Sequence, residues 1–401
     1  MSQAMSKTDQ TKLKLTALIG LCALSFMAMS QGALSPAIAN FAQIWPEHIA
    51  NIALINTMPN LLCIPFSILS GRLADKGILS YKQLALLAVG ICAVSGIVPA
   101  FFCTNFFFIL AARALFGLGM GLFQPICASV ILLLVPGDRA RHYLSITAAA
   151  SSLGGILFQV IGGLLCDIAT NLTFLSYVMA VAAWVLILLF LPNPPRAVKD
   201  TAGKKREPMG MMVLFWGIMN MLFSGVFFIM TNNMSFVVIN NNMGTAADAA
   251  FALSLFTVGA LVGSILSHQI FRIFKNFTMT ACCVIGIVGY IILTLGNSIG
   301  FMYLGCFLFG LGFGSWNPCL QTYTGRSVPE SMTSTALSLV MCCAGIGNFL
   351  SAYLVNGLNS VFHGSDRFGF ILGAAIFAVM GIVLAVVGIR MTVRERQNAA
   401  E

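Results

Sequence analysis

Charged residues are scarce in this chain and almost absent from its long apolar segments. Only 8% of the 401 residues are charged, whereas 59% are hydrophobic. This composition would expose insoluble surface in water, but it suits helices whose outer faces contact lipid. Uncharged runs long enough to cross a bilayer cover residues 15–46, 49–71, 143–166, 168–195, 208–247, 249–267, 276–325, 331–362 and 368–389. The sequence therefore predicts an all-α polytopic membrane protein.

Groups that would build a metal or catalytic site are also missing. The 12 Cys are scattered without a Cys-x-x-Cys motif or a Cys/His cluster, and the four His lie at the ends of apolar runs. We find neither a nucleophile and base pair nor a phosphate-binding loop. We therefore expect no metal site, no cofactor and no enzymatic activity.

Counting the helices requires dividing the longest runs at their turn signals. Residues 83–137, which only Arg113 interrupts, divide near Asn105, and residues 276–325 divide near Gly296. The predicted spans are then twelve: 14–36, 48–71, 82–102, 105–133, 142–166, 171–192, 210–232, 248–268, 277–296, 300–325, 332–356 and 367–390.

Lys and Arg are distributed unequally between the predicted loops. Of the 21 Lys and Arg, all but Arg113 and Arg367 lie in the termini, in alternate loops and in the central linker. The positive-inside rule therefore predicts a plasma (cytoplasmic) membrane protein with both termini in the cytoplasm. These loops also account for the net charge of +9, so no nucleic-acid partner is needed.

The sequence contains an internal repeat. Residues 116–136 align without gaps to residues 309–329, which equates the fourth span with the tenth. Because an even number of helices separates the copies, we expect two six-helix halves in the same orientation. These halves are residues 1–192 and 209–401, and the charged, Pro-rich segment 193–208 is the expected cytoplasmic linker.

The loop after the second span reads GRLADKGILSYK. Five of its residues, Gly71, Leu73, Ala74, Asp75 and Lys76, match the loop 2–3 signature of the major facilitator superfamily, which the loop therefore resembles. Residues 77–80 depart from it. In the family the Asp lies near the N-terminus of the eleventh span. The resemblance thus implies a cytoplasmic gate of Gly71, Asp75, Lys76, Arg139 and Arg141, in which Asp75 meets a helix dipole and pairs with an arginine. The alternative is a solvated loop with ordinary topogenic charge.

Two further segments support the resemblance. The fourth span is similar to a superfamily motif in which glycines follow an arginine: Arg113, Gly117, Gly119 and Gly121. The antiporter motif of the fifth span is only half present, because Gly162 and Gly163 fit it but Phe158 and Gln159 replace its Gly-Pro. With the repeat and the twelve spans, the resemblance covers essentially the whole chain and leaves the subfamily open.

Arg113 is the only charged residue inside a predicted span. It lies about nine residues, or about 13 Å, from the outer end of the fourth span. An arginine at this depth costs roughly 2.5–3.5 kcal/mol on insertion scales, so it should face a polar interior. Either it binds an anionic group of a solute or takes part in coupling, or it is a strut that donates hydrogen bonds to neighbouring helices.

Neutral polar residues in the spans are the other candidates for the walls of a cavity. They are Gln31, Asn56, Asn60, Gln124, Gln159, Asn220, Trp316, Asn317 and Asn348. Taken singly, each Asn or Gln is more often a helix–helix hydrogen bond than a ligand contact, and Trp316 can simply be a packing residue. Two glycine pairs are expected to bring neighbouring helices close together: Gly117 with Gly121, and Gly310 with Gly314.

The absence of Asp and Glu from the interior of every span bears on function, since Asp248 lies at the end of its span. A proton-coupled exporter of cationic drugs usually needs a carboxylate within the membrane. We therefore expect a secondary transporter of a small neutral or anionic organic solute, which uses alternating access at a midplane cavity between the halves. A coupling proton or a counter-substrate is the candidate second partner, and we expect a monomer.

Two alternatives stay open. Multidrug efflux is favoured by 32 Phe and 21 Met, which would line an adaptable pocket. A channel or receptor is disfavoured because it would not need two matched halves.

Single-cysteine labelling tests the predicted orientation. A membrane-impermeant thiol reagent should modify cysteines engineered near Asn241 and Ser360 in intact cells, and should modify those near Lys204 and Arg394 only after permeabilisation. Reaction near Lys204 in intact cells would reverse the orientation.

Overall fold

The computed structural model describes residues 14–75, 78–102, 105–135, 138–194, 210–328, 333–362 and 366–398, and every regular element within them is a helix. In chain order these are α1 (Leu15–Phe26), η2 (Met27–Ala37), α2 (Ile38–Ile44), η3 (Pro46–Asn51), α3 (Leu54–Asp75), α4 (Tyr81–Phe101), α5 (Phe106–Phe123), α6 (Ile126–Leu134), α7 (Asp138–Ile168), η4 (Thr170–Tyr177), α8 (Val178–Phe190), α9 (Met211–Asn240), α10 (Ala246–Phe274), η5 (Lys275–Phe277), α11 (Thr278–Leu295), α12 (Ile299–Arg326), α13 (Thr333–Phe362) and α14 (Phe368–Asn398), where η marks a 3-10 helix.

The helices follow the uncharged segments of the sequence. Ten stretches of the described chain are long and apolar enough to span a membrane. One of them, Ala246–Leu295, contains both α10 and α11, and α13 contributes the shorter apolar segment Leu339–Val355. The all-α fold is therefore confirmed, and these helices are compatible with twelve crossings.

Side chains cap the N-termini of two helices by accepting hydrogen bonds from backbone NH groups that have no partner within the helix. Ser80 begins α4 with a capping box, in which its hydroxyl accepts from Gln83 N and the Gln83 side chain accepts from Ser80 N. Asn105 begins α5 by accepting from Phe107 N at 3.0 Å. At the far end of α10, Lys275 has a φ of 45° and turns the chain into α11.

Some helices are longer than the predicted spans. Helix α9 continues to Asn240, eight residues beyond residue 232, where the predicted seventh span ends. It includes Asn232 and Asn233. Asn232 is buried, so its amide faces protein rather than an aqueous loop. Likewise, α7 begins at Asp138 and α14 reaches Asn398, because a helix can carry charged residues past the membrane surface.

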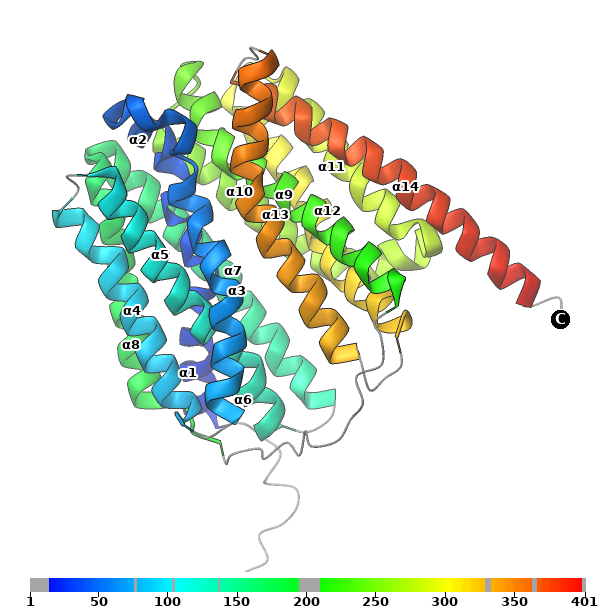
Figure 1. Cartoon of the computed structure of the whole chain (residues 1–401), viewed down its shortest axis with the longest axis horizontal. Coiled ribbons are helices and arrows are strands. Elements are labelled where there is room, and N and C mark those ends of the chain that lie inside the picture. Colours follow the sequence, from blue (N-terminus) through cyan, green and yellow to red (C-terminus); the bar gives the residue numbers. More distant parts are fainter. Residues whose placement is uncertain are drawn as a thin grey trace, which may run out of the picture.

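Buried apolar residues form two clusters. The first runs from Leu21 to Leu191 and includes one residue from beyond the linker, Ala246. The second runs from Val213 to Leu384. Figure 1 shows the corresponding helices as two groups, blue to green and green to red, that lie closest near α2 and spread apart toward the opposite end. We call the end near α2 the α2 end. We call the opposite end the termini end, because α1 begins there and α14 finishes there.

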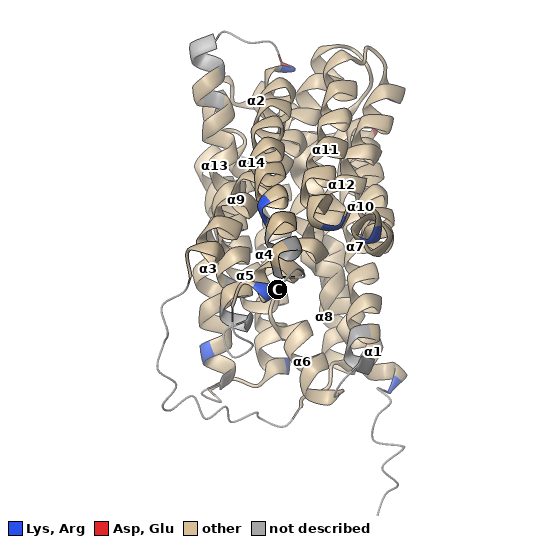
Figure 2. Ribbon diagram, turned by 90° about the vertical axis from the view of Figure 1, so that its right-hand side faces the viewer, with Lys and Arg blue, Asp and Glu red and all other residues tan. Residues whose placement is uncertain are grey.

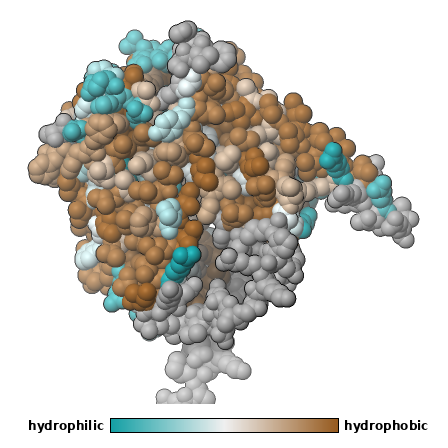
Figure 3. Space-filling view, viewed as in Figure 1, coloured by the Kyte–Doolittle hydropathy of each residue, from teal (hydrophilic) through white to brown (hydrophobic). Residues whose placement is uncertain are grey.

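The outer surface of the bundle is apolar. Large exposed hydrophobic side chains come from nearly every long helix, for example Val94, Leu132, Ile265 and Val379. Figure 3 shows this surface as mostly brown, and Figure 2 shows few charged residues along the helices, with most Lys and Arg away from the α2 end. A surface of this kind belongs in lipid, so the protein is an integral membrane protein.

The repeated glycines lie at equivalent helix contacts. A Cβ on Gly117 or Gly121 of α5 would lie 2.5 Å from the carbonyl oxygen of Pro59 or Cys63 in α3. A Cβ on Gly314 of α12 would collide in the same way with the backbone of α10 at Ala260. The span 4 helix thus packs on span 2 as the span 10 helix packs on span 8, which gives the sequence repeat a spatial counterpart.

Candidate solute site

The seam is the surface where residues 14–194 contact residues 210–398. The hydrogen bonds that join two described residues across it lie in the middle of the bundle or toward the α2 end. One of these joins η2 to α9: Ser235 Oγ donates to Pro36 O at 2.5 Å and accepts from Ala39 N at 3.4 Å. A single buried hydroxyl thereby satisfies two backbone groups at the exit of a 3-10 helix.

A carboxylate makes the second contact across the seam. At the end of α7, Asp167 accepts from Ala246 N at 3.1 Å, Ala247 N at 3.4 Å and Thr245 Oγ1 at 2.8 Å. These are the first residues of α10, so the negative charge lies at the positive end of a helix dipole in the other part of the chain. One turn before Asp167, Gly163 packs against the same turn of α10, with space for no side chain.

Carboxamide side chains form the third contact, nearer the middle of the helices. Asn56 Nδ2 of α3 donates to Asn232 Oδ1 of α9 at 2.8 Å. One helical turn further along α3, Asn60 Oδ1 lies 3.3 Å from Gln31 Nε2 of η2 and 3.4 Å from Asn348 Nδ2 of α13. We call these five residues the carboxamide cluster. Sequence analysis named Gln31, Asn56, Asn60 and Asn348 singly, and the fold brings them together.

Each of four cluster members leaves one polar atom without a partner, and so does the neighbouring Gln159, whose Nε2 lies beside Gly32. The unpaired atoms are Gln31 Oε1, Asn56 Oδ1, Asn60 Nδ2, Gln159 Oε1 and Asn232 Nδ2. Turning over the Asn348 amide lets its nitrogen donate to Ser224 O at 3.0 Å and Ala344 O at 3.2 Å, and its oxygen, in place of its nitrogen, then faces Asn60. An unpaired buried polar atom costs about 1–3 kcal/mol, so the cluster holds unused capacity to bind a polar ligand.

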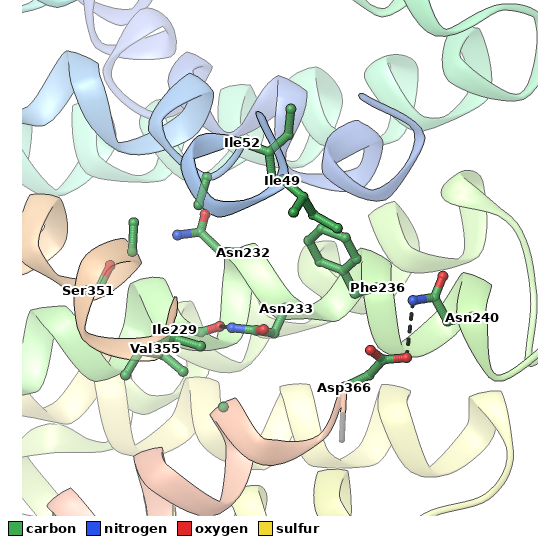
Figure 4. Close-up of a pocket in the computed structure, with 13 residues that line it drawn as sticks. Ile49, Ile52, Ile229, Asn232, Asn233, Phe236, Asn240, Ser351, Val355 and Asp366 are labelled. Atoms are coloured by element: carbon green, nitrogen blue, oxygen red, sulfur yellow. Dashed lines mark hydrogen bonds between the residues drawn. The ribbon is translucent and has the colours of Figure 1, made fainter. Parts of the chain in front are cut away.

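A cavity of about 170 Å³ adjoins the cluster on the side of the α2 end. Asn232 belongs to both, and the cavity continues past Asn233 and Ser351 to Asp366 at its mouth. Figure 4 shows Ile49 and Ile52 on one side and α9 and α13 on the other, so both parts of the chain line it. At the mouth, Asn240 Nδ2 donates to Asp366 Oδ2 at 3.1 Å.

Arg113 lies behind the cluster and is completely buried. Its Nε donates to Ile55 O at 2.7 Å, one terminal nitrogen donates to Tyr177 Oη at 2.8 Å and the other donates to Gln31 O at 3.3 Å. The guanidinium also lies 4.6 Å from the centroid of the Phe116 ring. These bonds connect α5 to η2, to η4 and to the residues at the start of α3, which is the geometry of the strut alternative.

The predicted residues of span 10 lie elsewhere. Trp316 is buried in the second apolar cluster, where its ring stacks on that of Phe223 with 3.9 Å between the ring centroids. Its indole Nε1 donates to Asn220 Oδ1 at 3.2 Å. Asn220 in turn donates to Val340 O at 2.9 Å. Asn317, one residue beyond Trp316, is half-buried. These contacts join α9, α12 and α13 within one part of the chain and do not cross the seam.

Gln124 is exposed and accepts from Cys63 Sγ at 3.1 Å, toward the termini end. Of the predicted gate, a Cβ on Gly71 would have open space around it. Lys76 and the side chains of Asp75, Arg139 and Arg141 lie outside the described residues, so the gate stays a prediction. Among the described residues, no three of His, Cys, Asp and Glu come close enough to hold a metal ion.

Sequence reasoning did not single out Asn232, Ser235 or Asp366 as site residues. Asn232 is the last residue of the predicted seventh span and Ser235 lies beyond it, and both belong to the polar segment 231–235, TNNMS. The signal was present, since residues 208–247 contain no charge, and a polar run within such a segment indicates a helix face turned toward protein. Asp366 carried no signal of its own, because it lies at a span end like any loop acid.

Comparison with known proteins assigns the fold. Residues 20–352 match the family model of the Major Facilitator Superfamily. No curated protein sequence gives a significant match. A crystal structure of a POT family transporter in complex with a thioalcohol-conjugated peptide has a TM-score of 0.77 and 13% identity, over 94% of this chain and 96% of that chain.

Two further crystal structures agree. The nucleoside transporter NupG has a TM-score of 0.71 and 14% identity, over 94% of this chain and 99% of that chain. A bacterial homologue of the human lysosomal transporter Spinster, in an inward-facing and occupied conformation, has a TM-score of 0.67 and 14% identity, over 95% and 96% of the two chains. Identities this low show a shared fold alone. The family model, however, covers most of the sequence, and the chain therefore belongs to the major facilitator superfamily.

Proposed function

We propose that this protein is a secondary transporter that moves a small neutral or anionic organic solute by alternating access between two halves, residues 1–192 and 209–401, joined by the linker 193–208. The carboxamide cluster carries the proposal, because it lies across the seam and leaves polar atoms unpaired where a solute would bind. The two separate apolar clusters support the division into halves. Superfamily membership supports secondary transport.

We further propose that the α2 end faces away from the cytoplasm and that the contacts across the seam close the path from there to the carboxamide cluster in this structure. The three contacts across the seam, through Ser235, Asp167 and the carboxamide cluster, support the closure. The basic loops at the termini end support the orientation. In the opposite state these contacts would break, and the gate proposed at Asp75 would close the cytoplasmic side.

Arg113 has a supporting role in this proposal. Each of its three nitrogens donates one hydrogen bond, to Ile55 O, Gln31 O and Tyr177 Oη, so it holds the backbone that carries the Gln31 side chain. Multidrug efflux receives less support, because the aromatic residues that would adapt to varied drugs, such as Phe223 and Trp316, stack on one another. Monomeric function and a coupling proton or counter-substrate remain parts of the proposal that rest on the superfamily.

Removing the Asp167 charge tests alternating access without knowledge of the solute. Asp167→Asn weakens a charge-assisted contact with α10, and such bonds contribute about 1.5–3 kcal/mol each. We expect a cysteine placed at Ser351, inside the cavity, to react with an impermeant thiol reagent at least about tenfold faster from outside. Asn171→Ala is the control, since the bond from Asn171 to Ala100 O stays within one half and Asn171 does not line the cavity. Equal rates in wild type and Asp167→Asn would contradict closure by this contact.

Replacing Arg113 shows whether its side chain is a strut between helices or contacts the solute directly. Arg113→Gln should lower the free energy of unfolding by roughly 2–3 kcal/mol, since it removes charge-assisted bonds in a buried site. The Kd for a solute that the reconstituted protein transports should stay within about twofold, measured on folded protein. Arg113→Lys keeps the charge but loses the planar fork, and should behave alike. A large rise of Kd in both variants with unchanged thermal stability would instead place Arg113 in direct contact with an anionic solute.

A further inference from the structure

The groups offered to a solute at the seam are amides rather than ions. We infer that the transported solute is an uncharged, hydroxyl-rich ring compound, bound by the carboxamides of Gln31, Asn56, Asn60, Asn232 and Asn348. This inference rests on the proposed function and names its substrate class.

The first step of the argument concerns charge. Two charged side chains of the described residues lie near the cluster. Arg113 is fully buried, and each of its nitrogens donates to a group within residues 14–194: Ile55 O, Gln31 O and Tyr177 Oη. Asp366 lies at the outer mouth of the cavity and is exposed. A charged solute at the cluster would lose its hydration without gaining a counter-charge, which makes binding unfavourable.

The second step concerns hydrogen bonding. Every carboxamide carries one acceptor oxygen and one donor nitrogen, and its orientation decides which of them meets a ligand. In the pair Asn56 and Asn232, one amide is left with an unpaired oxygen and the other with an unpaired nitrogen. The contact of Gln31 with Asn60 leaves the same combination. A hydroxyl group donates and accepts at once, so a ring bearing several hydroxyls satisfies both contacts.

The third step concerns size and shape. The cavity of about 170 Å³ adjoins the cluster at Asn232, the one cluster member that lines it, and is smaller than the roughly 300–1,000 Å³ that drug-sized ligands occupy. Ile49, Ile52 and Phe236 provide apolar walls opposite the polar groups of Asn232 and Ser351. A small ring with one apolar face and a hydroxylated edge fits this division, whereas a long flexible peptide does not. Sugars and nucleosides share this chemistry, and the probes below distinguish them.

Binding and uptake by the purified full-length chain test the inference. Glucose and uridine are the neutral probes. Glucose 6-phosphate, uridine monophosphate and glucosamine are their charged counterparts. In thermal-shift and proteoliposome uptake assays, glucose or uridine should bind and be transported, and its charged counterparts should bind at least about tenfold more weakly. Whichever of glucose and uridine binds more tightly shows whether the solute is a sugar or a nucleoside.

Two variants of Asn60 make the test independent of folding defects. Asn60→Leu keeps the size but removes the amide, and should weaken binding of the neutral probe about tenfold. Asn60→Asp keeps the shape, adds a carboxylate, and should shift preference from glucose to glucosamine, a gain that a misfolded protein does not show. Asn171→Ala is the matched control, since Asn171 bonds Ala100 O within one half.

The outcomes separate the inference from the proposed function. Tighter binding of a charged probe, an unchanged affinity in Asn60→Leu, or failure of both neutral probes to bind would overturn the inference. Uptake of a charged probe would still support the proposed secondary transport. The labelling of the Asp167→Asn variant needs no solute, so it decides alternating access separately.

Discussion

A buried polar atom in a bilayer has to find its partner inside the protein, and this constraint organises the whole molecule. It keeps the backbone helical, places the charges at helix ends, and turns each polar side chain of a span toward another helix. Arg113 meets the constraint with two backbone carbonyls and a tyrosine hydroxyl. The carboxamide cluster meets it only in part, and we propose that a ligand completes the hydrogen bonding of its unpaired atoms.

The same constraint explains how the halves are held together. Most of the contacts across the seam are uncharged hydrogen bonds, and Asp167 provides the one described carboxylate among them, at a helix N-terminus. Each such bond contributes only a modest net free energy, because water can replace it once the seam opens. A seam of this kind closes specifically but separates at low cost, which alternating access requires. The tight glycine contacts of α5 on α3, by contrast, lie within one half, where rigidity is needed.

Much of the fold could be predicted from sequence, because a bilayer makes helix positions visible as uncharged runs. The all-α fold and the superfamily are confirmed, and the helix boundaries agree except where a helix extends past the membrane or, as at Asn232, carries a buried polar run. The candidate site was less accessible to prediction. Gln31, Asn60 and Asn348 were named as separate polar residues, whereas Asn220 and Trp316 were named with equal weight and lie in a core. Sequence shows polarity but not which helix a side chain faces, and that depends on how the helices pack.

Cross-linking across the seam tests the central claim most directly. Cysteines introduced at Asn56 and Asn232, whose side chains bond at 2.8 Å, should be joined by a short bifunctional methanethiosulfonate reagent in a chain freed of other reactive thiols. The account predicts that this cross-link locks the α2 end and abolishes transport, that reductant restores it, and that a pair at Asn276 and Thr392, within one half, has no such effect. Full transport by the protein cross-linked between residues 56 and 232 would contradict a seam that opens and closes.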